Sequence, residues 1–222
     1  MQTTHYRRMS TFNYQAYVQE HKTPFGNLYV VNDEMLAGRQ RTVHTVEQDT
    51  YVLLLPVTGE LKVRVSPHGK KLRTDVEQLL VLTLPAGSSF ELGNPYEAEV
   101  ISYLVLWVKA SQPVQAVAVQ RFHFDFDHIE NKLGSIMQPE ADSNAPRFPF
   151  SLQLGLLEAR QEAICYQTFA SSSFFVFVLA GAFEVEGRSL QERDGLALWA
   201  TQAVEVGALS HHALILVLEL AS

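Results

Sequence analysis

Alternation of apolar and polar residues with a period of two is the feature that most constrains the fold of this chain. In Leu61–Val65 the apolar residues alternate with Lys62 and Arg64, which is typical of a strand with one face in the core and one in water. Tyr51–Leu55 is apolar throughout, as expected for a strand buried on both faces. Further strands are predicted over Gln78–Leu84, Val100–Val108, Phe174–Ala180, Ala182–Glu186 and Leu214–Leu220.

Turn signals separate these runs at short, regular intervals. They lie at Pro56–Gly59, Pro67–Gly69, Pro85–Gly87, Gly93–Pro95, Gly187–Arg188 and Asp194–Gly195. Short strands at this spacing predict an all-β sandwich or barrel. The one helix that the pattern suggests covers Val114–Val119 with its flanks, and the composition of Met137–Pro149 predicts a loop.

An internal repeat indicates that the chain contains two similar β-units. Val52–Val63 aligns with Ser173–Val185 when Gly59 is set on Gly181. Each copy reads as an apolar strand, a glycine turn and an alternating strand, so two strand–turn–strand units are the simplest interpretation. We therefore expect an N-terminal segment over 1–24, a first domain over 25–110 and a second over 111–222, with the boundary near Ser111–Pro113.

Charge is distributed unevenly between the halves. The 222 residues carry a net charge of −7; residues 1–110 hold 11 basic and 11 acidic residues, whereas 111–222 hold 6 and 13. An acidic chain of this kind argues against a general affinity for nucleic acid or anionic membranes. With 47% hydrophobic and 18% charged residues, the composition excludes a disordered chain.

The single cysteine and the lack of long apolar runs bear on the compartment. Cys165 excludes an intrachain disulfide, and its neighbours predict a strand with a buried, inert thiol. No apolar region of a secretory signal follows the first arginines, and no uncharged apolar run reaches the ~18–20 residues that span a bilayer. We expect a cytoplasmic protein that is a monomer or a homodimer.

Both halves of the chain contain segments that match one known family. In the second half these are Asn131–Leu133, Pro139, Ile164–Tyr166, Phe177–Gly187, Leu190, Arg193–Gly195 and Leu216–Leu220. In the first half they are Tyr51–Leu53, Gly59–Leu61, Asn94–Pro95 and Leu106–Val108. Through these segments the second half resembles the C-terminal half of pirin-like bicupins, and the first half resembles their N-terminal cupin. The resemblance implies two tandem cupin-type β-jelly-roll domains packed together.

The same resemblance implies a metal, usually iron, in the first cupin. The family's His-x-His pair falls on Arg41 and Val43 here, its later histidine on Phe90 and its glutamate on Leu92. An arginine and three hydrocarbon side chains cannot ligate a cation. His44 is one residue out of register, which in a strand turns a side chain to the opposite face.

Six residues are expected to lie at the mouth of the first barrel. Aromatic walls with a few polar groups are typical of a small-molecule pocket. The alternative is an ordinary core plugged by Phe90 and Trp107, with Glu47 paired to Arg41. The six are Arg41, His44, Glu47, Tyr51, Phe90 and Trp107.

Two further segments contain histidines that could bind a metal. His123, Asp125 and Asp127 alternate with phenylalanines and would share one face of a strand. The interpretation as a surface strand with solvated charges is favoured. The adjacent His211 and His212 would face opposite ways on a strand.

These observations favour a metal-free, non-catalytic bicupin that binds a small ligand or a protein and has no cofactor. One alternative is a cupin isomerase or a metal-dependent dioxygenase of the quercetin-cleaving type, with iron or another divalent transition metal. Another is a pirin-like partner of transcription proteins that uses the acidic second half. No nucleic-acid or membrane partner is expected.

Overall fold

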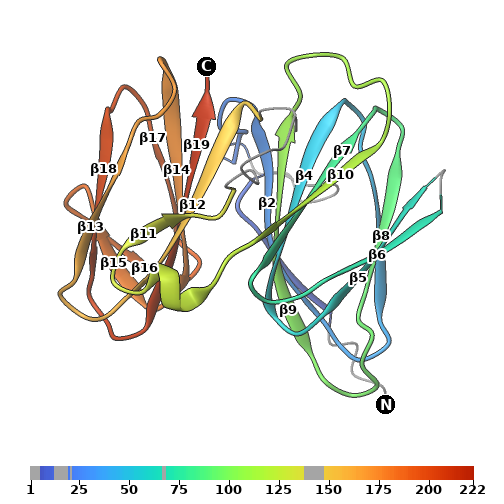
Figure 1. Ribbon diagram of the computed structural model, residues 1–222, viewed down its shortest axis with the longest axis horizontal. Coiled ribbons are helices and arrows are strands. Elements are labelled where there is room, and N and C mark those ends of the chain that lie inside the picture. Colours follow the sequence, from blue (N-terminus) through green and yellow to red (C-terminus); the bar gives the residue numbers. More distant parts are fainter. Residues whose placement is uncertain (1–5, 13–19, 21, 67–68, 138–147) are drawn as a thin grey trace. The chain divides into compact units, whose positions relative to one another are not determined.

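The computed structural model describes residues 6–12, 20, 22–66, 69–137 and 148–222. It divides into two compact units, residues 1–121 and 122–222, each built from two antiparallel sheets (Figure 1). Among the described residues, no helix is long and apolar enough to cross a membrane.

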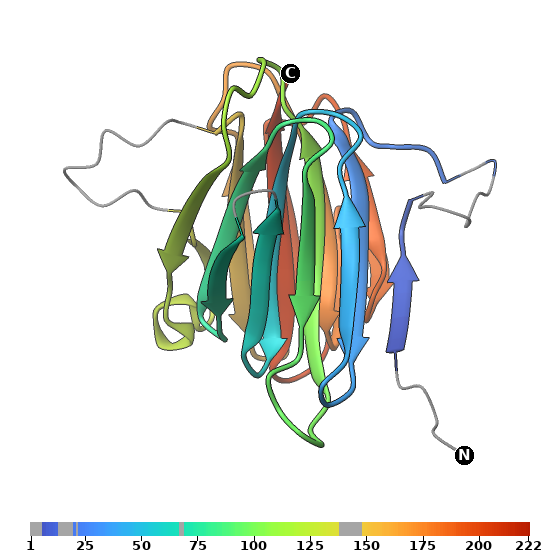
Figure 2. The same ribbon diagram turned by 90° about the vertical axis from the view of Figure 1, so that its right-hand side faces the viewer.

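The first unit pairs a six-stranded sheet of order β1-β2-β9-β4-β7-β10 with a four-stranded sheet of order β3-β8-β5-β6. Figure 2 looks onto the four-stranded sheet. The strands of the larger sheet are β1 (Tyr6–Ser10), β2 (Leu28–Leu36), β9 (Ile101–Lys109), β4 (Thr50–Thr58), β7 (Gln78–Leu84) and β10 (Ala118–His123). Those of the smaller sheet are β3 (Arg41–Thr45), β8 (Ser89–Gly93), β5 (Leu61–Ser66) and β6 (Lys70–Thr74).

The second unit repeats this plan, with a five-stranded sheet of order β11-β12-β19-β14-β17 and a four-stranded sheet of order β13-β18-β15-β16. The larger sheet contains β11 (Leu133–Ser135), β12 (Phe150–Leu157), β19 (Ala213–Ala221), β14 (Ser172–Ala180) and β17 (Gly195–Leu198). The smaller contains β13 (Glu162–Tyr166), β18 (Ala203–Ala208), β15 (Ala182–Val185) and β16 (Arg188–Gln191). A 3₁₀ turn, η1 (Phe126–Ile129), precedes β11.

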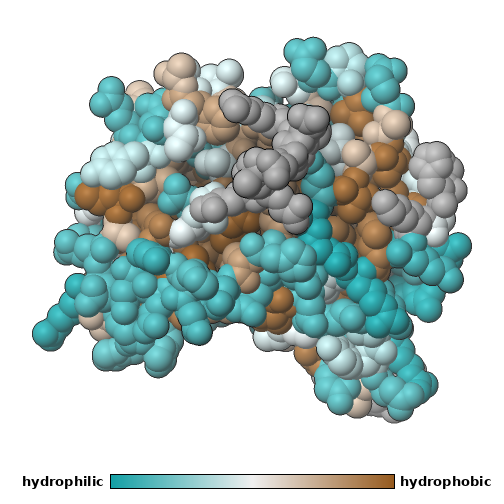
Figure 3. All heavy atoms as spheres, in the orientation of Figure 1, coloured by the Kyte–Doolittle hydropathy of each residue, from teal (hydrophilic) through white to brown (hydrophobic). Residues whose placement is uncertain are grey.

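Each unit has its own hydrophobic core between its two sheets. Alternate residues of β5 (Leu61, Val63 and Val65) enter the first core, as the period-two pattern predicts. The second core is built in the same way from β14, β15, β18 and β19. On the surface, hydrophilic residues cover much of the face in Figure 3, and smaller apolar patches lie on each unit.

The internal repeat is confirmed by the topology. The strand order β2-β9-β4-β7 of the first unit corresponds to β12-β19-β14-β17 of the second, and β3-β8-β5-β6 corresponds to β13-β18-β15-β16. Gly59 and Gly181 occupy the same turn and have φ angles of 69° and 76°. Such positive angles are disfavoured for residues with a Cβ atom, which explains why both copies keep glycine.

The strands predicted from the apolar and alternating runs are present, but the predicted helix is wrong. Val114–Val119 lies in a segment without helix that leads into β10. Because β10 extends the sheet next to β7, the two units divide at Arg121 and Phe122, later than the boundary expected near Ser111–Pro113. Residues 67–68 of one predicted turn and 138–147 of the predicted loop lie outside the described residues.

Candidate functional site

The inward face of β3 decides what the first barrel can hold. Arg41 and Val43 point outward, and Val43 is 61% exposed, whereas His44 is 1% exposed. The positions that the resemblance assigned to the His-x-His pair therefore lie on the outer face of the sheet. His44 lies on the face opposite to Arg41 and Val43, as its offset of one residue predicts, and it shares the inward side with Thr42.

His44 sits among aromatic rings inside the first barrel. Its ring stacks on Phe90, its cross-strand partner on β8, with centroids 5.0 Å apart and an interplanar angle of 17°. Trp107 meets it edge-on at 6.1 Å. Burial lowers the pKa of His44 to about 4, with the charge of Glu34 acting against this shift and that of Arg8 adding to it. The imidazole is therefore neutral at pH 7.

Glu34 forms the polar centre of this interior and is 0% exposed. Arg8 Nε donates to its Oε1 at 2.7 Å, and Asn32 Nδ2 donates to the same oxygen at 3.2 Å. The Tyr103 hydroxyl donates to Oε2 at 2.9 Å. The register brings these groups together, because Arg8 on β1 and Tyr103 on β9 are the cross-strand partners of Glu34 on β2. Together they form a buried ion pair in which both carboxylate oxygens of Glu34 accept hydrogen bonds.

Sequence reasoning missed Arg8, Asn32, Glu34 and Tyr103. The signal was weak, because Asn32, Asp33 and Glu34 read as one polar interruption of an apolar strand. Only the pairing of β2 with β1 and β9 shows that Asn32 and Glu34 are buried together.

Of the six expected pocket residues, the structure brings three together: His44, Phe90 and Trp107. Arg41 and Glu47 are exposed, and Arg41 Nη1 pairs with Glu91 Oε1 at 3.4 Å rather than with Glu47. Tyr51 is half-buried on the side of β4 opposite to Val52, whereas Val52 is the partner of Trp107. Arg41, Glu47 and Tyr51 therefore do not line the interior with the other three.

The donor groups inside the first barrel do not suit a transition metal. Of the residues that the structure describes there, His44 supplies an imidazole, Phe90 and Leu92 supply hydrocarbon, and the carboxylate of Glu34 is already balanced by the Arg8 guanidinium. Within the described ranges, no group of three or more His, Cys, Asp or Glu side chains is arranged to hold a metal ion. Transition-metal sites in proteins require several converging nitrogen, sulfur or oxygen donors. The residues present do not fit the metal that the resemblance implies.

The expected strand carrying His123, Asp125 and Asp127 is not formed. β10 ends at His123, and Asp125 caps η1 by accepting a hydrogen bond from the Asp127 amide at 2.8 Å. His128 Nδ1 lies 3.2 Å from Asp125 Oδ2. The alternation of these residues with phenylalanines therefore reflects a turn and not a shared strand face.

His211 and His212 also differ from expectation. They lie in the turn before β19, and both Nδ1 atoms contact one carboxylate, at 2.5 Å from Glu158 Oε2 and 2.7 Å from Oε1. The hydrogen bond from His211, outweighing partial burial, lowers the pKa of Glu158. The two imidazoles thus contact the same carboxylate, that of Glu158, instead of facing opposite ways.

The second barrel has a buried carboxylate of its own on a different strand, Glu219 of β19, which is 1% exposed. Burial raises its pKa, but the hydrogen bonds from Thr168, Phe169 and Ser172 outweigh burial and hold the pKa below its usual value. Cys165 is buried on β13, as predicted. Burial raises the pKa of its thiol to about 12, which makes it unreactive at neutral pH.

Comparison with known proteins agrees with this architecture. A family model described as the quercetinase C-terminal cupin domain matches residues 150–220. The crystal structure of the bacterial pirin YhhW from Escherichia coli in complex with nickel(II) superposes with a TM-score of 0.81 and 18% identity, covering 100% of this chain and 94% of that one. The chain has the fold of a pirin-like bicupin.

Other relatives extend the likeness of this bicupin. Quercetin 2,3-dioxygenase of Escherichia coli (strain K12) is 21% identical over 201 residues, which cover 89% of this chain and 84% of the relative. The crystal structure of YhaK from Escherichia coli has a TM-score of 0.78 with 18% identity, covering 97% and 94% of the two chains. The proteins that this chain resembles are therefore pirin-like and quercetin dioxygenase-like cupins.

The buried imidazole gives a prediction for pH dependence. His44 binds protons in the unfolded chain below its ordinary pKa of 6.5 but in the folded chain only near pH 4. Stability is therefore full above pH 6.5 and is lost as the pH falls toward 4. Wild type is expected to lose about 2 kcal/mol more than His44→Leu between pH 7 and pH 4.5, measured by urea unfolding. Equal losses of unfolding free energy in wild type and His44→Leu would contradict a buried, neutral imidazole at position 44.

Proposed function

We propose that this bicupin is metal-free and non-catalytic and acts as an interaction module through its outer surfaces. The observation that carries the proposal is the interior of the first barrel. There the Arg8 guanidinium balances the Glu34 carboxylate, and a neutral His44 is packed between Phe90 and Trp107. This interior has the character of a closed structural core, because its aromatic groups are buried and its carboxylate is already paired.

The test of this proposal is metal content after exposure to Ni²⁺, because a pirin similar to this chain was crystallised with nickel(II). Purified protein is incubated with excess Ni²⁺, passed over a desalting column and analysed for bound metal. We expect bound nickel only at the exposed His211 and His212, so that His211→Ala/His212→Ala reduces it to background. One tightly held nickel ion per chain in this double variant would overturn the proposal.

A gain-of-function variant provides the matched control and a separate prediction. Thr42 shares the inward side of β3 with His44, and Phe90 is the cross-strand partner of His44. Thr42→His/Phe90→His therefore brings three imidazoles together, which is the donor set that the wild-type interior lacks. In the His211→Ala/His212→Ala background this variant is expected to retain about one Ni²⁺ per chain. If this variant retained no nickel, the missing histidine ligands would not explain why the wild-type interior is expected to bind none.

The second candidate function is a metal-dependent dioxygenase of the quercetin-cleaving type. It is favoured by the similarity to a quercetin 2,3-dioxygenase over 89% of the chain. Oxygen consumption with quercetin, measured after incubation with Fe²⁺, Ni²⁺, Co²⁺ or Mn²⁺, separates the two functions. Turnover that disappears with a chelator and returns with the metal would replace the non-catalytic proposal with the enzymatic one.

A further inference from the structure

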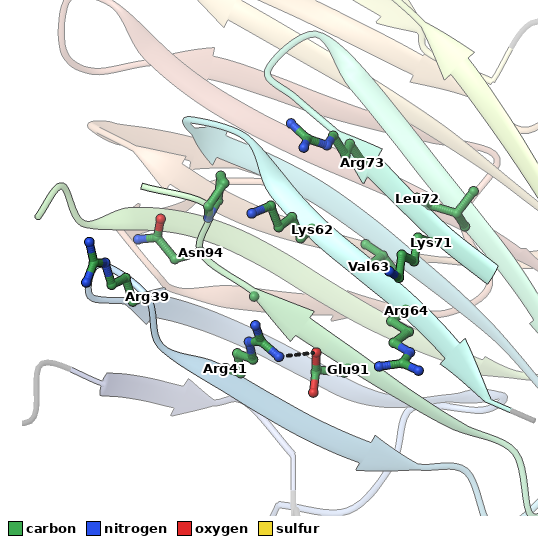
Figure 4. Close-up of a pocket in the computed structure, with 12 residues that line it drawn as sticks. Arg39, Arg41, Lys62, Val63, Arg64, Lys71, Leu72, Arg73, Glu91 and Asn94 are labelled. Carbon is green, nitrogen blue, oxygen red and sulfur yellow. Dashed lines mark hydrogen bonds and ion pairs between the residues drawn. The ribbon is translucent and has the colours of Figure 1, made fainter. Parts of the chain in front are cut away.

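The outer face of the sheet β3-β8-β5-β6 is strongly cationic. Exposed basic side chains project from β3, β5 and β6 (Figure 4). They line a shallow depression together with Gly93. Gly93 lies between Arg41 and Lys62 in the register and leaves a hollow there because it has no side chain. We call this surface the cationic face; it consists of Arg41, Lys62, Arg64, Lys71 and Arg73.

The cationic face holds more positive charge than its neighbours balance. Arg41 pairs with Glu91 at 3.4 Å and Arg73 with Glu60 at 2.9 Å. The other three cations have no ion pair with a described residue. In the register Lys62 lies opposite Arg73, and Arg64 lies opposite Lys71. Like charges directly across a strand pair destabilise a sheet, so an anionic partner would relieve a repulsion that the free chain carries.

The equivalent sheet of the second unit, β13-β18-β15-β16, carries the opposite charge. Its outer surface forms a shallow depression lined by exposed carboxylates, with Gly207 between Glu162 and Glu184 in the register. We call this surface the acidic face; it consists of Glu162, Glu184, Glu186 and Glu205.

The two faces match at the row that contains the central glycine of each sheet. The row Arg41–Gly93–Lys62 of the first unit corresponds to the row Glu162–Gly207–Glu184 of the second. The same strand plan, with a glycine at the centre of each row, therefore presents cations on one unit and carboxylates on the other. Opposed to each other, the two surfaces would be complementary in charge.

Exposed apolar side chains lie beside the charges on both faces. Val43, on the strand of Arg41, is 61% exposed. On β13 of the acidic face, Ile164 is 44% and Tyr166 is 66% exposed. Apolar residues among charged ones are typical of surfaces that bind protein, whereas a phosphate polymer offers nothing to cover them.

We propose that the cationic face of one molecule docks on the acidic face of a second copy of this chain. The contact joins two different surfaces, so it is heterologous and closes into a ring or extends as a chain of molecules. It deepens and rests on the proposed interaction role, in which the outer surfaces bind the partner. Metal content tests that role and oligomeric state tests this contact, so the failure of one is distinguishable from the failure of the other.

Charge reversal tests the contact. Sedimentation velocity of the full chain is expected to show association at low ionic strength that weakens as salt is added, because exposed charges are screened. Arg41→Glu/Lys62→Glu reverses the central row of the cationic face, and Glu162→Lys/Glu184→Lys reverses the central row of the acidic face, so each variant alone should associate less than wild type. Their equimolar mixture offers two matched pairs, the native faces with each other and the reversed rows with each other, and should associate again. The variant with all four substitutions should self-associate again.

The control reverses two lysines outside both faces. Lys109→Glu/Lys132→Glu changes the net charge as much as Arg41→Glu/Lys62→Glu does and should associate like wild type. Wild type that stays monomeric at low salt, or a mixture of the two reversed variants that associates no more than either variant alone, would overturn the proposal. So would a monomer that binds duplex DNA through Arg41 and Lys62, because the cationic face would then serve a polyanion.

Discussion

Glu34→Leu is expected to lower the free energy of unfolding of the first unit by about 3–5 kcal/mol, the usual effect of removing one partner of a buried ion pair. The substitution leaves the Arg8 guanidinium, whose side chain is 11% exposed, without its carboxylate. It also removes the acceptor for the Asn32 amide and the Tyr103 hydroxyl. The measurement is urea unfolding followed by Trp107 fluorescence in a Trp199→Phe background, so that the first unit alone is observed.

Two further variants show whether the loss comes from the uncompensated charge. Arg8→Met/Glu34→Leu replaces both partners with apolar groups and should recover most of the lost stability. Glu60→Gln breaks the exposed pair with Arg73 at 2.9 Å and should cost less than about 1 kcal/mol. A double variant as unstable as Glu34→Leu would mean that the loss arises from packing and not from the buried charge.

The strands were predictable because their signal is local. The alternation in Leu61–Val65 specifies which residues of β5 enter the core whatever pairs with it. The turns at Gly59 and Gly181 were also readable, because a glycine between an apolar and an alternating strand indicates a positive φ. These features sufficed for the bicupin architecture and its repeat.

Features set by pairing between distant segments were not predictable in the same way. The Arg8–Glu34 pair depends on the register of β1 against β2, which neither strand specifies alone. The resemblance assigned an interior ligand pair to Arg41 and Val43, but these residues lie on the outer face of β3, because an error of one residue in the register reverses every side chain. The helix expected over Val114–Val119 failed because β10 pairs with β7, and pairing in a sheet overrides weak local preference.

The opposite charges on the outer faces of the two four-stranded sheets show what the structure adds to composition. The uneven charge of the two halves was visible in the sequence. Its significance depends on Arg41 and Glu162 occupying equivalent positions beside Gly93 and Gly207. A net charge per half describes solubility, whereas charges in equivalent rows define two surfaces that can recognise each other.

Glu219→Leu is expected to destabilise the second unit by about 3–5 kcal/mol. The Glu219 carboxylate ties the segment between β13 and β14 to β19. Its Oε1 accepts from the amides of Thr168 (2.8 Å) and Phe169 (3.0 Å) and from Ser172 Oγ (2.7 Å). Its Oε2 accepts from Thr168 Oγ1 and from Ser151 Oγ at 3.2 Å. Removing one buried acceptor leaves several donors unpaired at once, which lowers the stability more than the loss of a single hydrogen bond does.

Hydrogen–deuterium exchange localises the effect of Glu219, since the amides of Thr168 and Phe169 should exchange first in the variant while the first unit stays protected. Glu219→Gln keeps the size of the side chain and adds a pH test. The pKa of Glu219 is held below the unfolded value, so its contribution is present above about pH 4.5 and is lost as the pH falls through the lower folded pKa. Wild type should therefore lose its advantage over Glu219→Gln on acidification, whereas Glu192→Gln, at an exposed site, should show no such convergence. An advantage that persists below the folded pKa would mean that the ionised carboxylate does not organise this segment.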